Sequence, residues 1–449
     1  MTQNEALDIL KMGHNILLTG VAGSGKTHTL NTYIEYLNGH SIGVAVTAST
    51  GIAATHLGGI TIHSWSGLGI RDDLSQYEMD MLEQRPYLWK RYQTTRVLII
   101  DEISMLHYFQ LDLIDKLCRV FKRINAPFGG MQVIFCGDFF QLPPISRAAS
   151  KETSFVYRSK VWSEMGLKIC YLSEQHRQSD QGFLRVLHDI RSDNVSEDTV
   201  EHLQNRYNKN STTKILPTKL LSHNADVDAI NTTELAKISG TSKRYYMSSR
   251  GKKNLVETLT KSCLAPRELV LKVGVRVMFV KNNFEKGYVN GTLGVVDKFG
   301  ANNAPIIRIA SGRKIPVEQA SWSSTDEGKL KAEITQIPLR LAWAITIHKS
   351  QGMSLDAAEI DLSKSFVEGM GYVALSRVRS LDGLKLLGIN RMALAVHPEV
   401  LKIDGMLKEY SDMAISMLKN IGIEEIKKSQ ATFLKNNKPQ KKYNAEMEE

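Results

Sequence analysis

Short apolar runs alternate with helical stretches through the first 170 residues of the chain. Four of these runs are rich in Val, Ile and Leu and end in small, polar or acidic residues, at 15–19, 41–47, 96–100 and 131–136. Runs that are apolar on both faces are typical of strands buried between the helices of a parallel sheet. The pattern predicts an α/β fold whose strand ends converge on one ligand site.

The pattern changes after about residue 173. Helical stretches continue to about 210, and a further apolar run covers 219–222. Turn residues such as Asn290-Gly291 then separate three β-rich runs, at 269–280, 294–299 and 306–309. Because short strands joined by such turns form hairpins, we predict a small all-β insert. Parallel-type patterning resumes at 383–388, and Pro398 takes the position that proline favours at the start of a helix.

Composition narrows the class of protein. Of 449 residues, 42% are hydrophobic, which is ordinary for a globular chain. The apolar runs are far shorter than the about 20 residues that a membrane helix needs, so no membrane span is expected. Lys and Arg exceed Asp and Glu by 57 to 47, and this net charge of +10 favours a polyanionic partner such as nucleic acid.

The first ten residues carry no basic residue, so no export signal is predicted. The four cysteines lack the close spacing of a zinc or redox pair. An intracellular, cytoplasmic protein of bacterial or phage type is expected, with a nucleus or organelle left open. The lysine-rich stretch from Lys427 is expected to fray as a disordered tail.

The segment 20–27, GVAGSGKT, matches the phosphate-binding loop G-x-x-x-x-G-K-[ST] between a predicted strand and a predicted helix. Gly20, Gly23 and Gly25 let the backbone N–H groups point at a phosphate, and the helix adds its positive end. Lys26 is expected to reach the β- and γ-phosphates, and Thr27 to coordinate Mg²⁺. The loop therefore predicts binding of ATP with Mg²⁺.

Two further strand ends carry matching chemistry. The run 97–100 ends in Asp101 and Glu102. A phosphate-loop enzyme needs one carboxylate for Mg²⁺ and one to activate the attacking water, and we assign Asp101 and Glu102 to these roles in that order. The run 131–136 leads to Gln141, whose amide is expected to sense the γ-phosphate.

The blocks 101–106, 127–130 and 135–144 together resemble the signature of the Pif (petite integration frequency) DNA helicases of superfamily 1, RecD/Dda-like branch. The last of these blocks contains the D-x-x-Q-L-P-P element that includes Gln141. The resemblance covers about residues 2 to 400, with the family's elements in order. Further segments resemble the adenine-reading glutamine at Gln3, the strand-contacting motifs Ia and Ib at 47–51 and 61–64, and motifs IV, V and VI at 172–178, 343–352 and 372–377.

The resemblance implies roles for further residues. Charge builds on the γ-phosphoryl group during hydrolysis, and we expect Arg177 and Arg377 to stabilise it. Gly352 joins the nucleotide-binding set, together with Gln3. The strand-contacting set would bind phosphate and sugar without reading sequence, and it consists of Thr47, Thr50, His63, Trp65, His348, Lys349 and Ser350.

The predicted architecture has two RecA-like parallel-sheet domains, with the following limits. Motor domain 1 spans 1–173 and includes a wedge insertion at 64–84, motor domain 2 spans 174–254 and 336–395, the β-barrel-like insert spans 255–335, and a C-terminal helical region with a basic tail spans 396–449. In the wedge, Trp65, Leu68 and Ile70 are expected to project at the mouth of the groove and cap the last base pair of a duplex. Trp65 could equally belong to a small local core.

We interpret the chain as a monomeric ATP-dependent helicase that moves along single-stranded DNA and acts on duplexes and fork junctions. The resemblance implies a 5′-to-3′ direction, duplex unwinding and resolution of G-quadruplexes. Two alternatives are open at this stage: a phosphate-loop phosphotransferase, and a non-catalytic nucleic-acid-binding scaffold with a vestigial nucleotide site.

Overall fold

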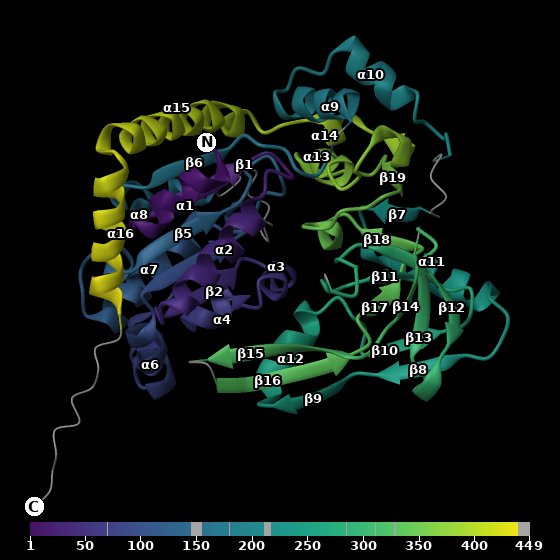
Figure 1. Ribbon diagram of the computed structural model, residues 1–449, viewed down its shortest axis with the longest axis horizontal. Coiled ribbons are helices and arrows are strands. Elements are labelled where there is room, and N and C mark those ends of the chain that lie inside the picture. The colour runs from purple at the N-terminus through teal and green to yellow at the C-terminus, as the bar shows by residue number, and fades with distance from the viewer. Residues whose placement is uncertain are drawn as a thin grey trace, which may run out of the picture.

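In the computed structural model, a parallel sheet near the N-terminus forms the core of motor domain 1 (Figure 1). The model describes residues 1–69, 71–144, 155–178, 180–210, 217–283, 285–309, 311–326 and 329–438. The six strands, in spatial order, are β3 (Ile60–Thr61), β2 (Val44–Ala48), β4 (Val97–Asp101), β5 (Gln132–Cys136), β1 (Ile16–Gly20) and β6 (Lys168–Leu172). The four predicted strands are confirmed to within a few residues, and their parallel pairing places their carboxyl ends along one edge.

Helices cover this sheet and pack against the apolar side chains of its strands. Strands β1 and β5 are buried at every position, as expected of strands enclosed on both faces. The helices of motor domain 1 are α1 (Gln3–Lys11), α2 (Lys26–Gly39), α3 (Gly51–His56), α4 (Ile62–Ser66), α5 (Gln76–Glu83), α6 (Pro86–Thr94), α7 (Tyr108–Lys122) and α8 (Lys160–Glu164).

The segment predicted as a projecting wedge is part of the core of motor domain 1. Trp65 is 3% exposed and Leu68 is fully buried, in one hydrophobic cluster with Met79, Leu82 and Tyr92. The Trp65 and Tyr92 rings lie 4.7 Å apart between centroids. The wedge prediction is therefore wrong for these two residues, because α5 and α6 supply the apolar partners that the segment lacks by itself. Ile70 lies outside the described residues. Deleting residues 66–70 would remove the core side chain of Leu68 and destabilise motor domain 1. Such a deletion therefore cannot test whether this segment separates DNA strands.

Motor domain 2 is built on a second, smaller parallel sheet. Its four strands, in spatial order, are β18 (Ala344–Thr346), β7 (Thr218–Leu221), β19 (Ala358–Leu362) and β20 (Leu384–Ile389). Its helices are α9 (Gln181–Arg191), α10 (Glu197–Gln204), α11 (Asn224–Lys237), α13 (Met370–Leu375) and α14 (Arg391–Leu394). The sheet is assembled from segments on both sides of the β insert, as the predicted split of this domain requires.

The insert starts earlier than predicted, because β8 pairs with β10 and β9 pairs with β16. Gly274, with φ at +88°, lies in the break that divides the apolar run 269–280 into two strands. The elements are β8 (Lys243–Tyr246), β9 (Ser248–Gly251), α12 (Lys253–Ser262), β10 (Glu268–Leu271), β11 (Arg276–Phe279), β12 (Leu293–Phe299), β13 (Pro305–Ile309), β14 (Lys314–Pro316), β15 (Ala320–Asp326), β16 (Lys329–Gln336) and β17 (Leu339–Leu341).

Two C-terminal helices run from motor domain 2 back over motor domain 1 (Figure 1). Helix α15 (Pro398–Ile421) packs on β6, and α16 (Ile423–Asn437) packs beside α1. The prediction of a tail that frays from Lys427 is wrong up to Asn437, because Phe433 is buried against the turn at Gly13. The residues after 438 lie outside the described part. Within the described ranges, no helix is long and apolar enough to cross a membrane.

Candidate active site

The phosphate loop lies between β1 and α2, as predicted. Gly25 caps α2 in the left-handed region, with φ at +87°, and Gly23 has φ at +89°. A Cβ at either position would also collide with a neighbour, at 2.1 Å from Gln3 Nε2 for Gly25 and 2.4 Å from Gln175 Oε1 for Gly23. Only glycine fits this conformation and this space, and the loop leaves the first N–H groups of α2 available for an anion.

Two polar groups of the loop match a phosphate ligand. Lys26 Nζ donates to the carbonyl oxygens of Gly20 and Val21, at 2.9 and 3.0 Å, and burial lowers the pKa of this amine. The Ser24 hydroxyl is buried and has no hydrogen-bond partner within the described part of the chain. Buried polar groups are normally paired, so a buried ammonium and an unpaired hydroxyl fit a site that binds an anion.

The two carboxyl groups at the end of β4, Asp101 and Glu102, would be stabilised by a cation. Burial raises the pKa of Asp101, and burial together with the neighbouring Asp101 raises that of Glu102 to about 8. Glu102 has φ at +51°, a conformation that turns the chain sharply after the strand. A divalent cation would offset this buried negative charge. Mg²⁺ is commonly held by one or two carboxylates plus substrate phosphates, so Asp101 and Thr27 fit it, although the described ranges contain no group of three or more His, Cys, Asp or Glu side chains arranged to hold a metal ion by themselves.

Gln141 follows β5 and lines a cavity together with residues of the phosphate loop. Its Nε2 donates to Asp138 Oδ2 at 3.1 Å. This bond uses one N–H of the amide and leaves its second N–H and its carbonyl oxygen for a bound ligand. The role of this buried amide as a sensor of the γ-phosphate stays a prediction.

The two predicted arginines reach the loop from the side of motor domain 2. Arg377 is 1% exposed, and its guanidinium donates to Val373 O at 2.9 Å and to Ser376 Oγ at 2.8 Å. Burial lowers the pKa of both arginines, and Arg377 adds to the lowering of Arg177 to about 9. Arg177 and Arg377 line the same cavity as Lys26, and three cations around one cavity favour a multiply charged anion between them.

One cavity of about 920 Å³ brings these groups together between the motor domains. Of the predicted residues it is lined by Gly23, Gly25, Lys26, Thr27, Glu102, Gln141, Arg177, Gly352 and Arg377. Asp101 lines an adjoining cavity of about 400 Å³, which also includes Thr27 and Glu102. Gln3 lies at the edge of the site, with Nε2 at 2.9 Å from His176 Nε2 and at 3.5 Å from Ser24 O. Gly20 ends β1 below the loop.

Three residues predicted to contact DNA are buried within the protein. Thr47 Oγ1 donates to Ile99 O at 2.6 Å, Ser350 Oγ donates to Ile347 O at 2.7 Å, and Trp65 packs on Tyr92. The prediction of direct strand contact is wrong for these side chains in this conformation. A hydroxyl at a strand end can satisfy itself on neighbouring backbone, which the sequence does not reveal.

The other members of the strand-contacting set are partly accessible. Thr50 of motor domain 1 and His348 of motor domain 2 both line the cavity of about 400 Å³. His63 and Lys349 are partly buried. Their contact with DNA stays a prediction, and their location on both motor domains fits a groove that crosses the boundary.

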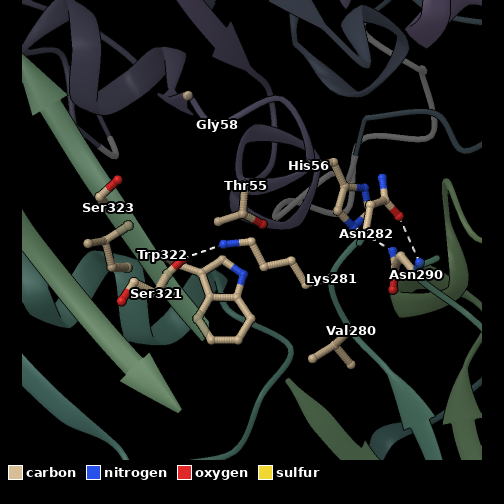
Figure 2. A pocket seen from close by; sticks show the side chains of 12 residues that line it. Thr55, His56, Gly58, Val280, Lys281, Asn282, Asn290, Ser321, Trp322 and Ser323 are labelled. Carbon is tan, nitrogen blue, oxygen red and sulfur yellow. Dashed lines mark hydrogen bonds between the residues drawn. The ribbon is translucent and has the colours of Figure 1, made fainter. Parts of the chain in front are cut away.

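A pocket of about 280 Å³ between motor domain 1 and the insert contains residues that sequence reasoning missed (Figure 2). His56 Nε2 lies 2.8 Å from Asn290 Nδ2, and burial lowers the pKa of this histidine to about 4. Lys281 Nζ lies 5.3 Å from the centre of the Trp322 ring on the insert side. These residues have no motif around them, so the only available signal was the turn Asn290-Gly291.

Fold and site together define a phosphate-loop NTPase with two motor domains and its nucleotide cavity between them. The sequence profile of the PIF1-like helicases matches residues 3–199, and that of the 2B domain of DNA helicase Pif1 matches 254–299. The chain is 45% identical to the ATP-dependent DNA helicase Pif1 of Psychrobacter sp., over 97% of this chain and 75% of that protein.

Solved structures agree with this comparison. The Bacteroides sp. Pif1 complex with ADP-AlF4 matches with a TM-score of 0.79 and 32% identity, covering 91% of this chain and 96% of the other. Bacteroides Pif1 with ADP-AlF3 and single-stranded DNA matches with a TM-score of 0.60 and 32% identity, over 92% and 97%.

The chain belongs to the Pif1 family of ATP-dependent DNA helicases. The predicted resemblance, the two-domain α/β class and the ATP-hydrolysing helicase activity are confirmed, and the phosphotransferase and scaffold alternatives are set aside. The roles of the other site residues and the other domain limits stay predictions.

Proposed function

We propose that this helicase hydrolyses ATP in the cavity between its motor domains and uses the cycle to move 5′ to 3′ along single-stranded DNA, opening duplexes and forks. The observation that carries the proposal is the composition of the cavity. Lys26 and Glu102 come from motor domain 1, whereas Arg377 follows α13 of motor domain 2. Because the cations of both domains face one site, a bound polyphosphate would draw the domains together and its hydrolysis would release them.

Each polar group then has a defined task. The N–H groups of the loop and the Lys26 ammonium bind the β- and γ-phosphates, and Gln141 reports on the γ-phosphate. Thr27 and Asp101 would hold Mg²⁺, which when bound supplies neutralisation of phosphate charge. Glu102 accepts a proton from the attacking water, and Arg177 and Arg377 stabilise the charge that grows on the phosphoryl oxygens.

One chain contains the complete site. Both arginines, the phosphate loop and the carboxylates belong to the same protein, so a second copy is not needed to complete the nucleotide cavity. This supports the proposal that the active unit is a monomer. The cytoplasm, the 5′-to-3′ direction and action on G-quadruplexes remain part of the proposal through the family resemblance.

DNA binding is expected to be non-specific and to weaken with salt. Backbone contacts that neutralise about 4 to 6 phosphates of a single strand give a slope of about −3 to −4 for log K against log salt. Lys349→Ala should make this slope shallower by about 0.7, because one cation is lost. Fluorescence anisotropy with labelled oligonucleotides of different sequence measures both quantities.

Lys314→Ala is the matched control for that titration. Lys314 lies on β14, an edge strand of the five-stranded sheet of the insert, and forms an ion pair with Asp297 at 2.8 Å. Its removal should leave the slope unchanged. A flat titration of the wild-type protein, or strong preference for one base sequence, would contradict the proposed backbone contacts.

The direction of movement is tested on duplexes with a single tail. The wild-type protein should open a duplex with a 5′ single-stranded tail in an ATP-dependent manner and should fail on the same duplex with only a 3′ tail. A blunt duplex serves as the control for tail-independent melting. Opening that proceeds from 3′ tails alone would overturn the proposed direction and leave the ATPase assignment untouched.

A further inference from the structure

Arg191, the last residue of α9, is a buried arginine that lies outside the nucleotide cavity. Its side chain connects the two motor domains. Its side chain is 7% exposed, and Nη1 donates to Asp138 Oδ1 of motor domain 1 at 2.7 Å. The guanidinium also lies 3.9 Å from the centre of the Phe140 ring. Burial opposes ionisation of Asp138, yet Arg191 lowers the pKa of this carboxyl below its ordinary value. The pair therefore remains charged within the domain interface.

Two pairs of hydrogen bonds connect this guanidinium to groups of the nucleotide site, each through one intermediate residue. Asp138 accepts from Arg191 with one carboxylate oxygen and from Gln141 Nε2 with the other. Arg191 Nη1 also lies 3.4 Å from the Tyr372 hydroxyl oxygen, which accepts the N–H of Ala22 in the phosphate loop at 3.1 Å. Arg191 thus supports both the amide of the γ-phosphate sensor and the start of the phosphate loop.

Hydrogen bonds also connect this guanidinium to the C-terminal helix α15. Arg191 Nη2 donates to the Tyr171 hydroxyl at 3.0 Å and lies 3.5 Å from Asp404 Oδ1. Tyr171 in turn donates to Asp404 at 2.9 Å, and its N–H donates to Ser411 Oγ at 3.2 Å. Asp404 and Ser411 both belong to α15, so this helix is tied to the same network that supports the nucleotide site.

We propose that Arg191 is a positioning residue for ATP hydrolysis, which holds Gln141 and the phosphate loop in fixed positions relative to motor domain 2. Asp404 connects helix α15 to the same hydrogen-bond network. The inference rests on the proposed function, since it concerns the same cavity. Arg191 does not touch the nucleotide, and it acts through Asp138 and Tyr372.

The chemistry of the guanidinium explains why arginine is needed. Its planar group presents several N–H donors in a fixed geometry, so it can bond Asp138 on one side and Tyr171 on the other at once. A lysine ammonium is a single point charge and would keep the pair with Asp138 while losing the second branch. Displacement of a catalytic group by about 1 Å can cost on the order of 10²-fold in rate.

The test compares Arg191→Lys with Arg206→Lys. Arg206 is a matched control, because its side chain is also 7% exposed and its guanidinium donates to Leu384 O at 2.7 Å and Asp382 O at 3.1 Å, all within motor domain 2. Arg191→Lys should lower kcat for ATP about tenfold or more, with binding of a fluorescent ATP analogue within about twofold of wild type. Arg206→Lys should leave both unchanged. Asp404→Asn should lower kcat in the same direction as Arg191→Lys but less.

Several outcomes decide against the inference. Unchanged kcat in Arg191→Lys overturns it, and so does an equal loss in both lysine variants that follows their loss of thermal stability. Unchanged kcat in Asp404→Asn overturns the connection to α15. If single-stranded DNA fails to stimulate the wild-type ATPase, the proposed function fails, whereas the comparison of the two lysine variants on basal ATP turnover still decides the role of Arg191.

Discussion

Lys26→Ala is expected to abolish ATP turnover while the protein stays folded. The Lys26 ammonium lies in the nucleotide cavity and donates to backbone carbonyl oxygens of its own loop, so its removal leaves no core packing defect. Loss of one preorganised electrostatic contact typically costs on the order of 10²-fold or more in rate. Steady-state phosphate release in the presence of single-stranded DNA measures the effect, and thermal unfolding checks the fold.

Lys122→Ala provides a matched control for this variant. Lys122 is also a buried lysine whose ammonium donates to a backbone carbonyl oxygen, that of Thr95 at 2.6 Å, but it lies outside the nucleotide cavity. Its removal should lower thermal stability more than turnover. If a folded Lys26→Ala protein turned over ATP as fast as the wild type, the assignment of the phosphate loop would be wrong.

Arg377→Ala is expected to lower kcat by about 10³-fold or more, as for other arginines that meet the transferred phosphoryl group. The charge that Arg377 opposes develops mainly in the transition state, so nucleotide affinity should change far less than kcat. Val373 and Ser376 fix the guanidinium before the nucleotide arrives, and this preorganisation is what makes the contact effective. Rapid-quench turnover and equilibrium binding of a fluorescent ATP analogue separate the two quantities.

Arg206→Ala controls for the loss of a buried arginine in the same domain. It should reduce stability through its unpaired carbonyl groups and leave the ratio of kcat to nucleotide affinity unchanged. If Arg377→Ala instead weakened nucleotide binding strongly with kcat retained, its role would be ground-state binding.

The nucleotide site could be predicted from sequence because its chemistry is local. The glycines and lysine of the loop follow a strand directly, and Asp101, Glu102 and Gln141 follow neighbouring strands, so parallel pairing alone brings them to one edge. Arg177 and Arg377 needed the family resemblance, since nothing in their own segments indicates which cavity they face.

The incorrect predictions share another cause, which is dependence on distant partners. Trp65 and Leu68 occur among polar residues and look accessible, but α5 and α6 bury them. Phe433 occurs among lysines, yet the turn at Gly13 gives it a place in the core. Arg191 carries no motif, and its importance follows only from residues far away in the chain that surround it in the fold.

ATP hydrolysis in the interdomain cavity is expected to be coupled to single-stranded DNA. The most direct test is the ATP turnover of the wild-type protein measured with and without an oligothymidine single strand, with Arg377→Ala assayed in parallel. Turnover of the wild type should rise many-fold with DNA, and turnover of the variant should hardly rise. Turnover that does not respond to DNA, or that responds equally in both proteins, would contradict this coupling.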